Sequence, residues 1–373
     1  MTTNPLGLYV HIPFCVKKCN YCDFCSFRLS DVNVKEEYID SLINEIFSYK
    51  HRKLSLDTIF FGGGTPSLLS CEEFSRIVDA INESFDVTPG CEFTVEVNPG
   101  TITEDKARTF ASKGVNRISI GLQSIHENEL KTLGRIHSYQ EFLSCYRLIK
   151  DCGISNVNID VMYGIPHQTV ASFLETLETV TSLNPSHLSL YGLILEEGTP
   201  FFENKECLPL PGEDIECDMY FLATEFMKKH GYTHYEISNY AKDGKESRHN
   251  LKYWRCQEYI GVGLAAYSCF DGKRFGNTEN MQEYISQNAE ECDYEEALTK
   301  EALAYEYVML GLRLKEGISL SEYKKLFGVD FMLGREKTVE DLVSNQLSAI
   351  CDDRFSLTER GFYVSNSILT DLL

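Results

Sequence analysis

LYVHIPFCVKKCNYCDFCSF, residues 8–27, is the stretch from which the fold can be worked out. It begins as an apolar strand and then places Cys15, Cys19, Cys22 and Cys25 within eleven residues. A structural zinc site takes its ligands from two Cys/His pairs separated by a longer loop, and no second pair follows here. Ferredoxin-type runs draw a fourth cysteine from a distance. The C-x3-C-x2-C spacing of the first three cysteines fits neither pattern, but three thiolates this close can hold one metal cluster and leave one of its irons open.

Strand-like and helix-like segments alternate downstream of this stretch. Runs rich in Val, Ile, Phe and Tyr are separated by segments whose apolar residues recur at a 3.6-residue spacing. Units of this kind predict an α/β fold with a parallel sheet, either open and doubly wound or curved into a partial barrel. The strand-like runs are residues 6–14, 57–63, 91–99, 117–124, 156–164 and 187–195.

The conspicuous polar and glycine motifs all lie where these predicted strands end. GGGTP (62–66) follows the second strand, Glu96 and Gln123 close the third and fourth, and Asp160 lies in the fifth. In both candidate architectures, functional residues gather at the carboxyl ends of the strands. The positions of the motifs therefore agree with the fold that the alternation predicts.

The alternation stops near Pro209. A helix is expected over 213–230, a strand over 233–241, and a linker or exposed helix start in the acidic stretch 288–300. The last seventy residues read as three helices and a short strand and turn. We therefore expect a strand–helix domain over 1–208, an extension of it over 209–287, and a small helical or winged-helix-like domain over 288–373.

Composition limits the class of protein. The chain has 373 residues, 43% of them hydrophobic, and a formal net charge of −21, which argues against a nucleic-acid partner. Fourteen cysteines without a recognisable secretory signal indicate a reducing compartment, so we expect a cytoplasmic protein. No apolar run is long enough for a transmembrane segment, although peripheral contact with a membrane is compatible with the sequence.

The glycine-rich loop and the polar residues at strand ends each allow two interpretations. Glycines in GGGTP could let the backbone approach a ligand closely, or could simply form a tight turn; the loop lacks the Gly-Lys-Ser/Thr of a Walker motif. Buried charges need a ligand or an ion pair. Glu96 and Asp160 could therefore face a cofactor, or pair internally with Arg117 and Arg135.

The motifs HIPFCVKKCNYCDF, FFGGGTPSLL, EVNPGTIT, GVNRISIGLQS, NIDVMYGIP and HNLKYW occur along the chain in this order. Together they resemble the anaerobic coproporphyrinogen III oxidase-like family of radical S-adenosylmethionine (SAM) proteins and, within it, the HemW heme chaperones. The resemblance implies a partial (β/α)6 radical SAM barrel. It also implies that Cys15, Cys19 and Cys22 bind a [4Fe–4S] cluster and that SAM occupies the fourth iron.

The resemblance further implies which residues hold the cofactors. In HNLKYW, His249 matches a histidine implicated in heme binding, and imidazole is a natural axial ligand of heme iron. The alternative for His249 is a hydrogen-bonded core residue. Arg248, Lys252 and Arg255 are the adjacent candidates for the heme propionates. The implied SAM-binding residues are Tyr9, Tyr21, Gly63, Gly64, Thr65, Glu96, Gln123, Arg135 and Asp160, of which the last three match a second SAM position.

Three functions are compared on this basis. The first is a HemW-like chaperone that binds heme and passes it to an acceptor protein. The second is an oxygen-independent coproporphyrinogen III oxidase, but such oxidases carry a longer segment before the cluster and a fourth cysteine two residues after the third. The third is an electron-transfer iron–sulfur protein without SAM, which would need Cys25 as a ligand. Tyr267 stands where relatives often have a histidine.

Overall fold

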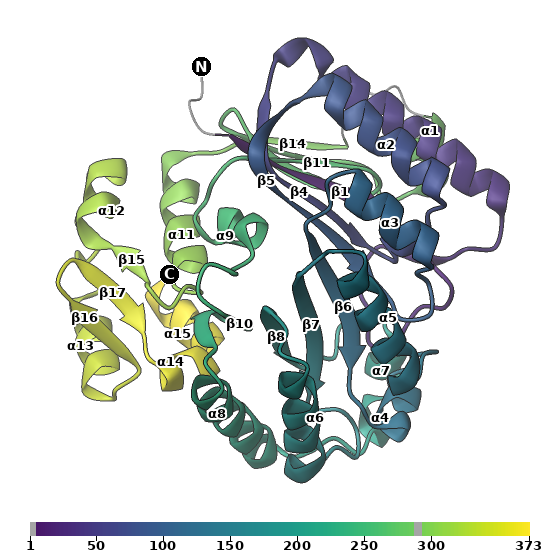
Figure 1. Ribbon diagram of the computed structural model, residues 1–373. Helices are drawn as coiled ribbons and strands as arrows, with labels where there is room; N and C mark the ends of the chain where they lie inside the picture. The colour runs from purple at the N-terminus through teal and green to yellow at the C-terminus, as the bar shows by residue number, and fades with distance from the viewer. Residues whose placement is uncertain (1–4, 287–292) are drawn as a thin grey trace.

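The computed structural model describes residues 5–286 and 293–373, and its centre is a curved, open sheet (Figure 1). Six parallel strands lie side by side in chain order, which is the arrangement of a partial barrel and not of a doubly wound sheet. They are β1 (Leu6–Ile12), β4 (Ser55–Gly63), β5 (Asp86–Val97), β6 (Arg117–Gln123), β7 (Asn156–Tyr163) and β8 (His187–Gly192). The predicted partial (β/α)6 barrel is therefore confirmed.

Helices cover the outer face of the sheet (Figure 1). They are α1 (Val32–Ser48), α2 (Cys71–Ser84), α3 (Glu104–Ser112), α4 (Glu127–Thr132), α5 (Tyr139–Asp151) and α6 (Val170–Ser182). The starts of α2, α5 and α6 are fixed by capping boxes, for example between Ser70 and Glu73, which satisfy amides that the helix leaves unbonded. These capping residues therefore fix where the loop before each of the three helices ends.

The side chains of β1 point alternately to the hydrophobic core and to the interior of the barrel. Leu8, Val10 and Ile12 are fully buried in the hydrophobic core, where α1 packs against the sheet. Because successive side chains of a strand point to opposite faces, Tyr9 and His11 point the other way, into the barrel. The strand therefore builds the core with one set of residues and a cavity wall with the other.

Later parts of the chain extend both edges of the six parallel strands. β10 (Asn239–Ala241) and β9 (Thr233–Glu236) add antiparallel strands beyond β8. β11 (Tyr259–Val262) adds a parallel strand beside β1, followed by β12 (Tyr267–Phe270), β13 (Lys273–Gly276) and β14 (Tyr294–Ala297). The cysteine loop between β1 and α1 contains the short paired strands β2 (Phe14–Cys15) and β3 (Phe27–Arg28).

One prediction for this region was wrong, and another was incomplete. Residues 233–241 form two antiparallel strands and not one, because the chain turns at Ile237, whose amide donates to the Arg313 carbonyl at 2.9 Å. The acidic stretch 288–300 lies partly outside the described residues. Its described part contains the unexpected edge strand β14, whose Glu295 and Glu296 keep an exposed edge charged, and ends with the expected helix start, where Thr299 caps a helix that begins at Lys300.

Four helices connect or flank the extended sheet: α7 (Pro200–Glu203), α8 (Glu213–Lys229), α9 (Arg248–Trp254) and α10 (Met281–Ser286). Of these, α8 and α9 contact both the barrel and the C-terminal domain, which has a second, smaller core, whereas α10 packs against α1. Three helices, α11 (Lys300–Gly311), α12 (Leu320–Phe327) and α13 (Glu336–Ser344), and a three-stranded sheet then form the C-terminal domain. Its other elements are β15 (Ile318–Ser319), β16 (Ser348–Cys351), β17 (Arg354–Leu357), α14 (Glu359–Tyr363) and α15 (Ser365–Leu372).

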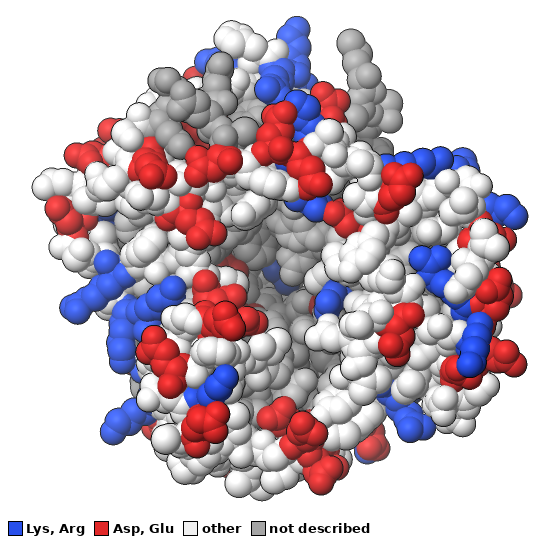
Figure 2. All heavy atoms as spheres, turned by 180° about the vertical axis from the view of Figure 1, so that it is seen from behind, with Lys and Arg blue, Asp and Glu red and all other residues white. Residues whose placement is uncertain are grey.

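Negative charge is spread over the surface. Figure 2 shows that the face seen from behind is hollowed near its middle and carries acidic side chains on several sides of the hollow. None of the helices in the described ranges is both long and apolar enough to cross a membrane.

Candidate functional site

The cysteine loop closes one end of the barrel, and contacts on its far side fix its position. The backbone and side-chain amides of Asn20 donate to the carbonyls of Leu133 and Thr132, at 3.0 and 2.9 Å. The amide of Phe201 donates in turn to the Asn20 carbonyl at 3.0 Å. The loop is therefore tied to two segments that follow later strands, although it contains little regular structure of its own.

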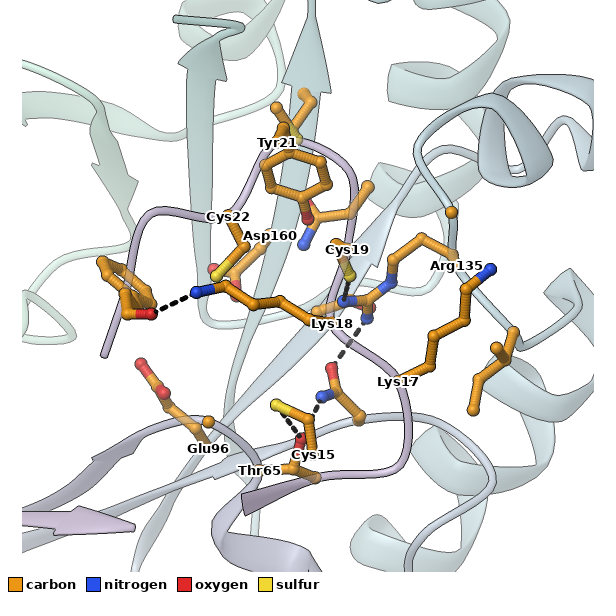
Figure 3. Close-up of a pocket in the computed structure, with 18 of the residues that line it drawn as sticks. Cys15, Lys17, Lys18, Cys19, Tyr21, Cys22, Thr65, Glu96, Arg135 and Asp160 are labelled. Atoms are coloured by element: carbon orange, nitrogen blue, oxygen red, sulfur yellow. Dashed lines mark hydrogen bonds between the residues drawn. The ribbon is translucent and has the colours of Figure 1, made fainter. Parts of the chain in front are cut away.

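Three of the four cysteines of the loop face a cavity of about 440 Å³, which we call the first cavity. The sulfur atoms of Cys15, Cys19 and Cys22 point toward its middle (Figure 3). Burial raises the pKa of Cys15 and Cys22, so these thiols keep their protons until a metal displaces them. Within the described ranges, no three His, Cys, Asp or Glu side chains converge on one ion, unlike the ligands of a mononuclear zinc site.

A chain of hydrogen bonds links two of these thiols across the cavity (Figure 3). The Thr65 hydroxyl donates to the Cys15 sulfur at 3.6 Å and accepts from the Asn98 side chain at 2.8 Å. Arg135 donates to the Asn98 side-chain oxygen at 2.7 Å and to the Cys19 sulfur at 3.6 Å. The positively charged end of this network therefore lies beside a cysteine that is expected to bind metal as a thiolate.

Two carboxyl groups face the same cavity from β5 and β7. Burial and, to a smaller extent, the neighbouring Asp160 raise the pKa of Glu96 to about 8, and the Gly63 amide donates to its carboxyl group at 3.2 Å. Burial also raises the pKa of Asp160, which accepts from Ser119 and Asn158. Neither carboxyl group forms the internal ion pair with Arg117 or Arg135 that the sequence left open. The site therefore favours a cationic ligand.

Unsatisfied polar atoms support a ligand in the first cavity. The side-chain oxygen of Gln123 and the Nε of Arg135 are buried without a hydrogen-bond partner among the described residues. Gln123 also has a backbone φ of +74°, a strained conformation for a residue with a side chain. A polar cofactor with both cationic and anionic groups fits these residues, and the three thiols fit an iron–sulfur cluster.

The glycines of GGGTP are required by the protein itself. A Cβ at Gly63, where φ is +106°, would lie 2.4 Å from the His11 ring. A Cβ at Gly64 would lie 2.7 Å from the Phe14 carbonyl oxygen. The loop therefore packs against the end of β1 more tightly than any other residue would permit. A valine at either position would therefore strain the packing of the barrel itself as well as block the approach of a ligand.

The structure brings together most of the residues singled out from the sequence. The first cavity is lined by Cys15, Cys19, Cys22, Tyr21, Gly63, Gly64, Thr65, Glu96, Gln123, Arg135 and Asp160. Sequence reasoning missed Asn98, Lys17, Lys18 and Tyr191, which also line it. Asn98 could have been found, because it follows Glu96 at the same strand end. Tyr9 and His249 do not line this cavity but a second one.

The second cavity, of about 460 Å³, is mainly aromatic. Tyr9 and Phe60 come from β1 and β4, Tyr253 from α9, and Tyr259 and Tyr267 from β11 and β12. Phe24, Gly63 and Glu96 line both cavities and form the wall between them. Cys25 lines the second cavity and not the first, which separates it from the other three cysteines of its loop.

His249 lies in the wall of the second cavity and is only 1% exposed. Its Nδ1 is 2.9 Å from the Thr58 hydroxyl and its Nε2 is 2.8 Å from the Tyr253 hydroxyl. Its ring stacks on Phe60 with a centroid distance of 5.2 Å. Burial lowers the pKa of His249 to about 3, so the ring is neutral. Both ring nitrogens are thus occupied, as in the alternative interpretation of a hydrogen-bonded core histidine.

The neighbouring cations have protein partners. Lys252 and Arg248 pair with Asp57 at 2.8 and 3.5 Å, and Arg255 pairs with Glu316 at 3.1 Å. None of the three lines the second cavity, so the structure gives no support to their expected contact with propionates. Trp254 is likewise outside the cavity wall and lies beneath the Arg313 guanidinium, 6.0 Å from it.

Comparison with known proteins agrees with this fold and site. A model of the radical SAM superfamily matches residues 9–180, and a model of the HemN C-terminal domain matches residues 298–364. The solved structure of coproporphyrinogen III oxidase (HemN) from Escherichia coli, a radical SAM enzyme, superimposes with a TM-score of 0.87. It is 23% identical, and the match covers 99% of this chain and 90% of that one, which shows a shared fold. The fold and the cysteine-lined cavity thus define a protein of the radical SAM class.

Curated relatives narrow this class. Heme chaperone HemW of Lactococcus lactis is 35% identical over 376 residues, covering 100% of this chain and 98% of the relative. The proteins of the same name from Bacillus subtilis and Escherichia coli are each 34% identical, with 96% and 98% of this chain covered and 97% of each relative. The chain therefore belongs to the HemW family.

Proposed function

We propose that this protein is a cytoplasmic heme chaperone, which binds heme and transfers it to an acceptor protein. One observation carries the proposal: a cavity lined by three thiols adjoins a second, aromatic cavity, and Glu96 belongs to both walls. A metal cofactor and a flat apolar cargo can therefore be bound next to each other. Full-length similarity to proteins named heme chaperones supports this function.

The proposed cofactors of the first cavity are a [4Fe–4S] cluster on Cys15, Cys19 and Cys22 and an exchangeable SAM. When bound, such a cluster supplies an open iron that can hold the amino and carboxylate groups of SAM. Glu96 and Asp160 offer negative charge to the cationic groups of SAM, and Arg135 offers donors to its carboxylate. Tyr21, Gly63, Gly64, Thr65 and Gln123 complete the proposed SAM site, and Tyr9 approaches it only through the shared wall.

The proposed cargo site is the second cavity. Its aromatic side chains suit the faces of a macrocycle, and His249 is in its wall. We propose that the chain has three domains, residues 1–208, 209–287 and 288–373. The first two build the second cavity: β1 and β4 supply one side, and α9, β11 and β12 supply the other.

Purified protein, reconstituted anaerobically with iron and sulfide, tests the proposal against the oxidase and electron-transfer alternatives. We expect stoichiometric heme binding by optical titration, transfer of that heme to an apo-cytochrome, and no conversion of coproporphyrinogen III. Conversion to protoporphyrinogen IX without heme binding would establish the oxidase instead. A cluster that needs Cys25 and does not respond to SAM in its reduced EPR signal would establish the electron-transfer protein.

A further inference from the structure

Heme iron cannot reach either ring nitrogen of His249 in this structure. Thr58 and Tyr253 occupy Nδ1 and Nε2, and the ring is 1% exposed. Tyr253, one helical turn after His249 in α9, also lines the cavity, and its hydroxyl is the group that contacts Nε2. Tyr253 is also held by the ring of Tyr259, edge to face at 4.6 Å.

A second tyrosine–histidine pair faces the same space. The Tyr9 hydroxyl is 3.0 Å from Nδ1 of His11, and Nε2 of His11 is 2.8 Å from the Cys25 carbonyl oxygen. A carbonyl only accepts, so Nε2 carries the proton of the neutral ring and Nδ1 accepts from Tyr9. The donor role of Tyr9 is therefore fixed. Around His249 the hydroxyl partner Thr58 can donate or accept, so the Tyr253 hydroxyl is free to change roles.

We propose that the second cavity binds ferric heme through the phenolate oxygen of Tyr253, and that His249 positions this oxygen without coordinating the iron. This inference rests on the proposed function and names the ligand atom within it. Tyrosine is an established class of heme ligand in proteins. A positioning role accounts for the hydrogen bond between the buried His249 and the hydroxyl of Tyr253. Direct ligation of iron by His249 would require that hydrogen bond to break.

The ligation step balances without an external reagent. Ferric heme arrives carrying hydroxide on its iron. The O–H bond of Tyr253 breaks, an iron–oxygen bond forms, and the proton leaves with the hydroxide as water. His249 stays neutral: Thr58 donates to its Nδ1, and its Nε2–H donates to the phenolate oxygen. No group changes oxidation state.

Charge favours this ligand over a neutral imidazole. The iron and porphyrin core of ferric heme carries one net positive charge, and a phenolate neutralises it inside a mainly apolar cavity. Glu96 lies across the shared wall and is the one acidic side chain among the described residues lining this cavity. Tyr9 donates its hydroxyl proton to His11 and cannot accept one from it, because the other ring nitrogen of His11 already donates to a carbonyl. The two pairs are therefore not equivalent, and only Tyr253 can accept a hydrogen bond from its histidine.

Isotope-edited resonance Raman spectroscopy of the full-length protein with bound ferric heme tests the ligand. We expect a high-spin heme with an iron–phenolate band that shifts with ring-deuterated tyrosine and not with ¹⁵N-histidine. Tyr253→Phe should lose the band, while Tyr305→Phe, at an exposed tyrosine that lines neither cavity, should keep it. His249→Ala should weaken heme binding about tenfold, and His249→Gln, which restores a donor, should recover part of it.

Each other outcome contradicts the inference in a distinguishable way. A low-spin heme whose iron band shifts with ¹⁵N-histidine would assign the iron to imidazole and leave the chaperone function standing. Loss of the band in Tyr9→Phe but not in Tyr253→Phe would assign the wrong tyrosine. Failure of the wild-type protein to bind heme at all would overturn the proposed function, and this inference with it.

Discussion

The two cavities are built by different means although they share a wall. The first lies at the carboxyl ends of successive parallel strands, where loops supply thiols and an arginine and the strands β5 and β7 supply carboxyl groups. The second is lined by side chains from strands, from one helix and from the cysteine loop, and it is mainly aromatic. The first is therefore a site for charged cofactors, and the second suits a flat apolar molecule. The contrast shows that one sheet provides both kinds of cavity when its edge is extended by later strands.

The largest effect is expected from substituting the cysteines of the loop that line the first cavity. Cys15→Ser, Cys19→Ser or Cys22→Ser should abolish the iron–sulfur absorbance, because each removes a thiol from the first cavity. Cys25→Ser should retain it, because that thiol lines the second cavity. Iron and sulfide analysis with EPR of the reduced protein measures both. Loss of the cluster in Cys25→Ser would show that Cys25 is a cluster ligand, which contradicts its assignment to the second cavity alone.

The next largest effect is expected from substituting Gly64 in the GGGTP loop. Gly64→Val should lower the free energy of unfolding by about 3 kcal/mol, since its side chain would collide with the backbone at Phe14. Gly212→Ala is the matched control, because no atom lies within 4 Å of the added Cβ, and it should change stability by less than about 0.5 kcal/mol. Urea denaturation measures both variants. A stable Gly64→Val protein that loses only SAM would show that Gly64 is needed for the ligand and not for packing against Phe14.

A smaller effect is expected at Glu96, which faces both cavities. Between the ordinary carboxyl pKa of 4.5 and its value of about 8, the folded protein holds a proton that the unfolded chain has lost, so stability falls as pH rises. Glu96→Gln should remove this slope and raise the free energy of unfolding above pH 8 by about 1–3 kcal/mol. It should also weaken SAM binding about tenfold above pH 8, because there a carboxylate opposite a cation is lost.

Thermal unfolding and calorimetric SAM titration between pH 5 and 9 check this prediction. The exposed Glu83→Gln serves as the control for removing one negative charge. An unchanged pH slope in Glu96→Gln would mean that another group, such as Asp160, carries the titration.

The smallest effect is expected at the rim of the second cavity. Tyr267 is 48% exposed, so Tyr267→His should change the free energy of unfolding by less than about 0.5 kcal/mol. It also places an imidazole at the position where relatives often have a histidine. We expect a partial shift of bound ferric heme from high to low spin, measured by EPR. An unchanged spectrum would show that this rim position does not reach the iron.

The first cavity was predictable from sequence, and the second was not. Gln123 ends β6, and Glu96 and Asp160 lie in the last halves of β5 and β7; parallel topology brings such positions together whatever the rest of the chain does. The sequence did not reveal that Tyr9 lines the second cavity, because its neighbour β11 comes from residues 259–262 and no local pattern predicts that pairing. The partners of the cations near His249 were hidden for a similar reason, since Asp57 and Glu316 are distant in sequence.

Pairing of β1 between β4 and β11 sets an order of events during synthesis. Ile12 and Tyr259 are 247 residues apart, so at about 5–20 residues per second the ribosome needs roughly 12–50 s to deliver the second neighbour of β1. Until then one edge of the strand that leads into the cysteine loop has no partner, and the second cavity has no outer wall. The thiols, whose cavity needs nothing beyond Glu196, are in place first. A nascent chain would therefore complete the proposed cluster site before the proposed heme site.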